Sequence, residues 1–135
     1  VEMTLELIPL ATATLKVAKP ITVSPGLIVG EVTSLEIEGD RLRASLRGKA
    51  AADWMRLTPD GYGTIDVRFT VETHDGAVIY VEYSGRFQFD TATAYSTPRF
   101  HTADDRYTWL NRIQAVGKGH FAAADTVAYE LFELR

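Results

Sequence analysis

Two stretches of this chain alternate apolar and polar residues with a period of two, and this alternation constrains the fold more than any other feature. In residues 62–73 the apolar positions are Ile65, Val67, Phe69 and Val71. In residues 77–89 they are Ile79, Val81, Tyr83, Phe87 and Phe89. Successive side chains of a strand point to opposite faces, so each stretch predicts a strand with one face in a core.

Short glycine-containing segments separate these stretches from their neighbours. They are Glu38-Gly39-Asp40, Pro59-Asp60-Gly61 and His74-Asp75-Gly76. Because glycine adopts positive φ at little cost, the segments predict tight turns. We expect hairpins that join residues 27–38 to 41–48, 54–58 to 62–73, and 62–73 to 77–89. Further strands are expected at 3–17, 93–102, 107–117 and 124–134, and at most a turn or two of helix at 49–56.

This succession of short strands predicts an all-β fold. A closed antiparallel β-barrel of about eight strands is expected, with a β-sandwich as the alternative. A barrel of this size encloses a lumen that side chains fill or that holds one small ligand. The 135 residues, 46% of them hydrophobic, suit a single β-barrel domain spanning 1–135.

The composition disfavours several classes of partner. A net charge of −4 provides no basic stripe for nucleic acid or for an anionic membrane surface. No apolar run approaches the roughly 18 residues that a membrane span needs. The chain has no Cys, which excludes disulfides and thiol catalysis. The first residues lack the basic and apolar regions of a signal peptide, and we expect a cytoplasmic protein.

The segments around the predicted turns resemble one protein family. The matching segments are 38–43, 52–54, 56–61, 65–70, 75–81, 97–100, 106–112, 116–117 and 129–134. In order and spacing they resemble the domain of unknown function 3237 family, also called uncharacterised protein family 0311. The resemblance covers roughly residues 25–135. Residues 83–95 depart from it, because many relatives carry a longer insertion there, and this difference could change what reaches a pocket mouth.

The resemblance implies a small antiparallel barrel similar to allene oxide cyclase and other calycin-like barrels. It also implies a homo-oligomer, a dimer or higher. Most members of the family have no assigned activity, whereas some relatives act on polyketide-like substrates in natural-product pathways. The wider barrel group includes cyclases that shape a substrate without a cofactor. Fold likeness alone does not establish function, so the site must be argued from its residues.

Four charged residues are the candidate catalytic groups. Asp66 and Arg68 share the polar face of the strand at 62–73, where the pair could orient a substrate, hold an anion or transfer a proton. The alternative is a surface ion pair worth about 0–1 kcal/mol. Arg99 could clamp an anion at a barrel mouth or be structural. Asp53 could be a general base at the pocket rim, although an Asp at such a junction more often caps a turn.

Aromatic residues supply the candidate substrate-binding surface. Those singled out are Trp54, Tyr80, Tyr107 and Trp109. They could line an apolar pocket and offer polar groups to a ligand, or they could belong to the core. Asn111 follows Trp109 on the same face of the strand expected there. It could donate to a developing oxyanion or satisfy a neighbouring backbone group.

Motifs for cofactors and metals are missing from the sequence. His74, His101 and His120 are far apart and form no close pair, so we expect no metal site. Of the three, His101 is the best candidate for proton transfer by residue type. No nucleophile elbow, P-loop or dinucleotide fingerprint occurs, and we expect no cofactor.

Together these features favour a cofactor-free small-molecule enzyme of the cyclase, isomerase or lactone-forming type. Its substrate would be an apolar, polyketide-like molecule held in the barrel lumen. Arg68 and Arg99 would stabilise negative charge, and Asp66 or Asp53 would handle the proton. Two alternatives stay open, a barrel that binds a small apolar acid without chemistry and a scaffold with a solid lumen that acts through oligomer contacts.

Overall fold

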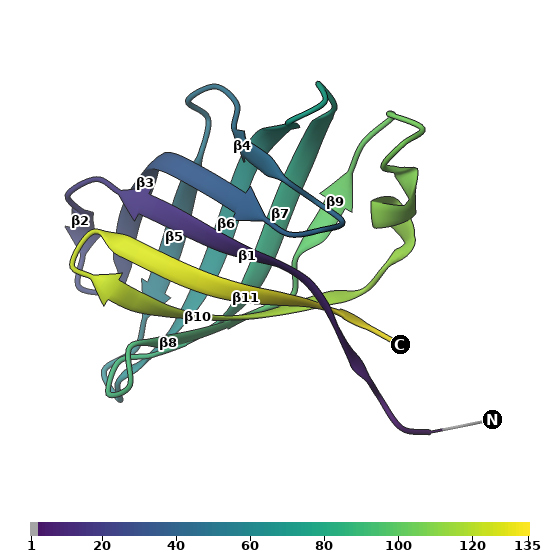
Figure 1. Cartoon of the computed structure of the whole chain (residues 1–135). Coiled ribbons are helices and arrows are strands. Elements are labelled where there is room, and N and C mark those ends of the chain that lie inside the picture. The colour runs from purple at the N-terminus through teal and green to yellow at the C-terminus, as the bar shows by residue number, and fades with distance from the viewer. Residues whose placement is uncertain (1–2) are drawn as a thin grey trace.

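The computed structural model describes residues 3–135, which fold into a closed antiparallel β-barrel of eight strands. Around the barrel the order is β3, β1, β11, β10, β8, β7, β6 and β5, and β5 pairs again with β3. These strands are β1 (Leu7–Val17), β3 (Leu27–Glu38), β5 (Ala52–Leu57), β6 (Tyr62–Thr73), β7 (Val78–Gln88), β8 (Thr93–Ser96), β10 (Ala115–Ala123) and β11 (Thr126–Leu134). Figure 1 shows them wrapped around one lumen.

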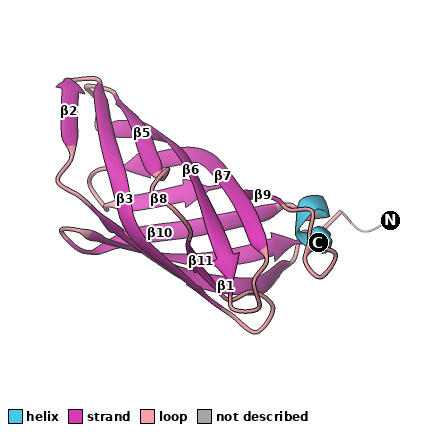
Figure 2. Cartoon of the chain, turned by 90° about the horizontal axis from the view of Figure 1, so that it is seen from above, coloured by secondary structure: helices cyan, strands magenta, loops and turns pink. Residues whose placement is uncertain are grey.

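Four shorter elements complete the barrel wall and its ends. They are β2 (Ile21–Ser24), β4 (Ala44–Leu46), β9 (Arg99–His101) and the 3₁₀ helix η1 (Thr108–Arg112). β9 and η1 lie at the end that we call the closed end, and β2 with the tips of the β7–β8 and β10–β11 hairpins lies at the opposite, open end (Figures 1 and 2). No helix within residues 3–135 is long and apolar enough to cross a membrane.

The strongest alternating stretches form the strands that the pattern predicts. β6 and β3 have the predicted bounds, and β7 is one residue shorter at each end. Gly61 and Gly76 have φ of +90° and +91°, the region that favours glycine, so the predicted turns at 59–61 and 74–76 are confirmed. Gly39, in the third predicted turn, does not have a positive φ. β6 and β7 then pair from Tyr62↔Gln88 to Glu72↔Val78.

Several sequence predictions are wrong in detail. Residues 49–56 form no helix, since residues from Ala52 onward belong to β5. The strand expected at 107–117 is instead η1 followed by β10, because Tyr107 and Leu110 bury side chains at the three-residue spacing of a 3₁₀ turn. The strand at 93–102 is broken into β8 and β9, β2 was not predicted, and β4 is shorter than 41–48.

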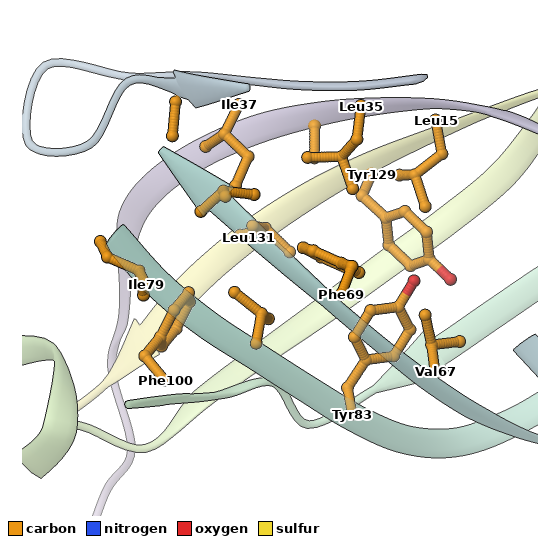
Figure 3. Close-up of a cluster of buried hydrophobic side chains, with 14 of the residues drawn as sticks. Leu15, Leu35, Ile37, Val67, Phe69, Ile79, Tyr83, Phe100, Tyr129 and Leu131 are labelled. Carbon is orange, nitrogen blue, oxygen red and sulfur yellow. The ribbon is translucent and has the colours of Figure 1, made fainter. Parts of the chain in front are cut away.

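The lumen near the closed end is packed with side chains. Leu35, Ile37, Val71, Ile79 and Leu110 are each at most 2% exposed. Residues from β1, β3, β6, β7 and β11 meet there (Figure 3). Burying each such side chain stabilises the fold by about 1.5–3 kcal/mol. The core therefore holds this half of the barrel together.

Candidate functional site: an apolar cavity at the open end

The open half of the lumen is not packed solid. It contains a cavity of about 400 Å³, within the range of roughly 300–1,000 Å³ that ligand pockets span. Among the described residues that line it, only Asp53, Tyr83 and Tyr129 have side chains with an O–H or carboxylate group, and the other side chains are apolar. The cavity therefore has an apolar wall and a single polar region.

Aromatic side chains surround the mouth of this cavity. Phe87 lies edge-on to Phe89 and to Phe121, with ring centroids 4.9 and 6.0 Å apart. Phe89 and Phe121 are 42% and 39% exposed, so two rings of the rim face both solvent and lumen. Phe89 and Ala92, both from the segment 83–95, line the cavity.

Asp53 projects into the cavity from β5. It is half-buried and in phase with Met55, another lining residue, whereas Trp54 between them is on the outer surface. Its Oδ1 accepts a hydrogen bond from the backbone N–H of Asp66, at 3.1 Å. The ladder between β5 and β6 pairs Asp53 with Val67 and Arg56 with Thr64, but the two residues between Asp53 and Arg56 are not paired. The Asp53 carboxylate therefore bonds to the β6 backbone where this ladder is interrupted. Asp53 is thus a strand residue, and the predicted turn cap is not observed.

The surroundings of Asp53 favour its neutral form. Burial raises its pKa from 3.8 to about 6, against the lowering effect of the Asp66 N–H, and the charge of the Asp66 carboxylate raises it further. No cation contributes to this balance. At neutral pH the protonated and ionised forms are therefore both accessible, as acid–base catalysis requires.

Gly30 lies directly across the β3–β5 ladder from Asp53 and also lines the cavity. A Cβ atom placed there would meet nothing within 4 Å. Glycine inside a strand often marks a place where a ligand approaches the backbone closely. Its missing side chain leaves the space in front of the Asp53 carboxyl open.

Tyr83 from β7 and Tyr129 from β11 form the other polar part of the wall. Their hydroxyl oxygens point toward each other (Figure 3), and the two side chains share a hydrogen bond. Burial raises the pKa of both phenols, that of Tyr129 to about 12, and the Asp53 carboxylate adds to both shifts. A hydrogen bond between two phenols uses only one of their two O–H groups, so the other O–H is left for another acceptor.

The Tyr129 ring depends on a glycine for its position. A Cβ at Gly119 would lie 2.6 Å from Cε1 of Tyr129, so the ring packs directly on the backbone of β10. The edge-to-face contact between Tyr83 and Tyr129, at 5.8 Å between centroids, fixes the other side. Both phenols are therefore held in place before any ligand binds.

Three of the four predicted catalytic residues lie outside the lumen. Asp66, Arg68 and Arg99 are exposed on the outer face of the barrel, where Arg68 Nη2 is 3.9 Å from Asp66 Oδ2. Asp66 and Arg68 lie outside because the inner face of β6 carries Ile65, Val67 and the other apolar residues. Arg99, expected at a barrel mouth, lies on the outer face of β9, where its neighbour Phe100 is the buried residue. The alternative interpretation, a polar strand face with a surface ion pair, describes the geometry.

The predicted substrate-binding residues are not brought together in the cavity either. Trp54 is on the outer face under the Arg68 guanidinium, 4.8 Å from its ring centroid, and Tyr80 hydrogen-bonds Glu82 at 3.4 Å. Tyr107, Trp109 and Asn111 lie around η1 at the closed end.

Each of these closed-end residues has a structural contact. Tyr107 donates to Asp75 Oδ1 at 2.8 Å, and Trp109 lies under Arg41, 4.6 Å from the guanidinium carbon. Asn111 accepts from Thr102 N–H at 2.9 Å and donates to Thr102 C=O at 2.8 Å, which is the backbone role left open as its alternative. The expected placement of Trp109 and Asn111 on one strand face is wrong because both belong to a helix.

No sequence motif marked Tyr83, Tyr129, Gly30 or the phenylalanines as site residues. Tyr83 and Phe87 are in phase with the apolar face of β7, so the period of two already placed them inside. The charged residues that suggested chemistry lie on the polar faces of the strands, which are the outer faces of the barrel. As for metals, no group of three or more His, Asp or Glu within residues 3–135 could hold an ion.

Comparison with known proteins agrees with this architecture. A family model described as "Protein of unknown function (DUF3237)" matches residues 5–134. The chain belongs to this family. It is also 28% identical over 101 residues to a UPF0311 protein of Bradyrhizobium diazoefficiens, an alignment that covers 61% of this chain and 66%, just under two thirds, of that relative.

Solved structures of similar proteins share the barrel. A beta-barrel like protein from Acinetobacter baumannii AYE has a TM-score of 0.87 at 25% identity and covers 100% of this chain and 99% of that one. A conserved protein of unknown function from Rhodopseudomonas palustris gives 0.88 at 21% identity, with both chains covered completely. An enzyme from Penicillium herquei gives 0.69 at 23% identity, covering 96% of this chain and 94% of that one. The last two show the fold alone.

Proposed function

We propose that this DUF3237 protein is an enzyme that moves a proton within a small apolar molecule bound in the open-end cavity, in an isomerisation or a ring closure. One observation carries the proposal, namely the Asp53 carboxyl, which is aimed into an apolar cavity with no cation beside it and has a pKa near 6. Carboxyl groups with raised pKa values in apolar pockets are a recurring feature of acid–base catalysts.

The chemistry needs no co-reactant. The Asp53 carboxylate takes a proton from a carbon next to a carbonyl, or from a hydroxyl, and becomes the neutral acid. The electron pair left behind forms an enolate or attacks a second centre of the same molecule. Asp53 then returns the proton at another position, so the substrate and product have the same composition and the enzyme is restored.

The phenol pair has a defined part in this reaction. One of its two O–H groups is not used in the bond between Tyr83 and Tyr129, so it can donate to the oxygen on which negative charge develops. A donor held rigidly in a water-poor site contributes more than the same donor in water. The other phenol holds this donor in position.

The proposal is tested with a probe that does not require the natural substrate. In D₂O, NMR would follow exchange of the protons next to the carbonyl of 2-tetralone, a small apolar ketone. We expect the wild type to accelerate exchange and Asp53→Asn to lower the acceleration at least about 100-fold. Tyr129→Phe should lower it about 10-fold or more.

Glu36→Gln is the matched control, because it removes an exposed carboxylate from the outer face of β3 that has no contact with Asp53. It should keep the wild-type acceleration. Equal exchange in the wild type and in Asp53→Asn would contradict the role of Asp53. A bound but unchanged compound would favour the alternative of a barrel that binds small molecules without chemistry.

A further inference from the structure

We infer that the open-end cavity selects its ligand by charge, taking neutral apolar compounds with one hydroxyl or carbonyl oxygen and rejecting carboxylic acids, and that Asp53 is the residue that enforces this choice. The inference rests on the proposed function for the place of binding, but it requires no turnover. It narrows the substrate class and counts against the alternative in which the barrel binds a small apolar acid.

The first argument is the charge on the cavity wall. Among the described residues that line the cavity, Asp53 is the only ionisable group apart from the two phenols, and none is Lys, Arg or His. His120 shares a smaller neighbouring pocket with Asp53, and its side chain is exposed. A bound carboxylate would therefore lose its hydration without gaining a cation, which is costly.

The second argument is that a charged ligand would share the one polar region of the cavity with Asp53. This region consists of Asp53 and the Tyr83–Tyr129 pair, which line the same cavity. A ligand whose oxygen accepts from the unused phenol O–H therefore lies in the same region as the Asp53 carboxylate, whose charge acts on both phenols. Like charges within one cavity repel strongly where water is scarce. A hydroxyl or carbonyl in the same position can accept from the phenol without this repulsion.

The third argument is that one side chain can switch the preference. Asparagine is nearly the same shape as aspartate, and its Oδ1 can still accept the Asp66 N–H. Asp53→Asn therefore removes the charge while keeping the contact that holds the side chain. The remaining wall, including the rim of Phe87, Phe89 and Phe121, is unchanged.

The test compares two compounds with one skeleton, 2-naphthalenemethanol and 2-naphthoate, by fluorescence titration at pH 8, where both Asp53 and the acid are ionised. We expect the wild type to bind the alcohol about 30-fold or more tightly than the acid. In Asp53→Asn the ratio should fall to within about 3-fold, mainly through tighter binding of the acid. Glu36→Gln, which removes an exposed carboxylate on the outer face of β3, should keep the wild-type ratio.

A blocking variant shows where the compounds bind. Gly30→Leu fills open space beside Asp53, so it should fold with wild-type thermal stability and lose binding of the alcohol. Equal affinity for both compounds in the wild type, an unchanged ratio in Asp53→Asn, or no binding of either compound would overturn the inference. Loss of 2-tetralone exchange with the ratio intact would instead contradict only the proposed function.

Discussion

At each end of the lumen an inward-facing carboxylate can be compared, Glu133 at the closed end and Asp53 at the open end. The surroundings shift the pKa values of these two groups in opposite directions. At the closed end, Glu133 is 7% exposed and accepts from Arg41 at 2.6 Å and from Arg135 at 3.0 Å. Hydrogen bonds from Arg135 and Arg41 lower its pKa. At the open end, Asp53 has no cation, and burial raises its pKa to about 6.

The difference shows that a buried carboxylate is not by itself a sign of function. Glu133 belongs to a packed end, where Arg41 also covers Trp109, and its ion pairs serve the fold. Asp53 faces an unfilled cavity and costs the folded state stability when it ionises. A group that a protein keeps at such a cost is a candidate for chemistry.

The largest difference between the two ends should be in the stability lost when a packed side chain is truncated. Leu110→Ala removes a side chain that is 1% exposed and should lower the free energy of unfolding by about 2–5 kcal/mol. Phe121→Ala at the open rim, where the ring is 39% exposed, should cost much less but weaken binding of 2-naphthalenemethanol. Urea unfolding and titration would check both, and similar losses of stability would mean that the two halves do not differ as described.

Neutralising Asp53 should stabilise the protein. Because the pKa of Asp53 is about 6 in the folded state, against an ordinary value of 3.8 for aspartate, stability falls as pH rises between about 4 and 6. Above pH 6 the full cost is present, up to about 3 kcal/mol. Asp53→Asn should therefore raise Tm at pH 8 and match the wild type below pH 4. Thermal unfolding across this range measures the effect, and a constant difference at all pH values would argue against it.

Neutralising Glu133 should have the opposite sign. Its pKa is lowered, so its stabilising effect is present above the unfolded value of 4.5 and is lost as pH falls through the folded one. Glu133→Gln should cost about 1–2 kcal/mol at pH 7, and the cost should shrink in acid. The same unfolding series would show it, and stabilisation at pH 7 would contradict the structural role.

The smallest effect is expected on the outer face. Arg68→Met breaks an exposed pair with Asp66 and should change stability by about 0–1 kcal/mol. It should also leave 2-tetralone exchange at the wild-type rate, because Arg68 lies outside the cavity. A large loss of exchange with normal stability would indicate that the outer face takes part in the reaction.

Much of the fold was predictable from the sequence because its main strands alternate cleanly. Residues 62–73 form β6 and residues 27–38 form β3 as predicted. The misses occur where local pattern and tertiary contact disagree. Trp109 and its neighbours have strand-like composition, yet Leu110 packs under the closed end as part of η1. Ala50, Ala51 and Ala52 suggest helix, but Ala52 pairs with Glu31 and Arg68.

The site was less predictable because chemistry-bearing residues were sought on the polar face. Asp66 and Arg68 alternate with the apolar residues of β6, so the same period that predicted the strand placed them outside. Asp53 was named, but the reason for its importance is the cavity it faces. That cavity depends on Gly30 across the ladder and on Tyr129 from the far end of the chain, and one local segment does not reveal such contacts.

The most direct test of the account is the titration of the Asp53 carboxyl itself, followed by ¹³C NMR and assigned by its loss in Asp53→Asn. The account predicts a midpoint near pH 6 and a further upward shift when 2-naphthoate is added in excess. A midpoint near 3.8, the ordinary value for aspartate, would show that the carboxyl is well solvated or paired. The open-end cavity would then lose its acid–base group.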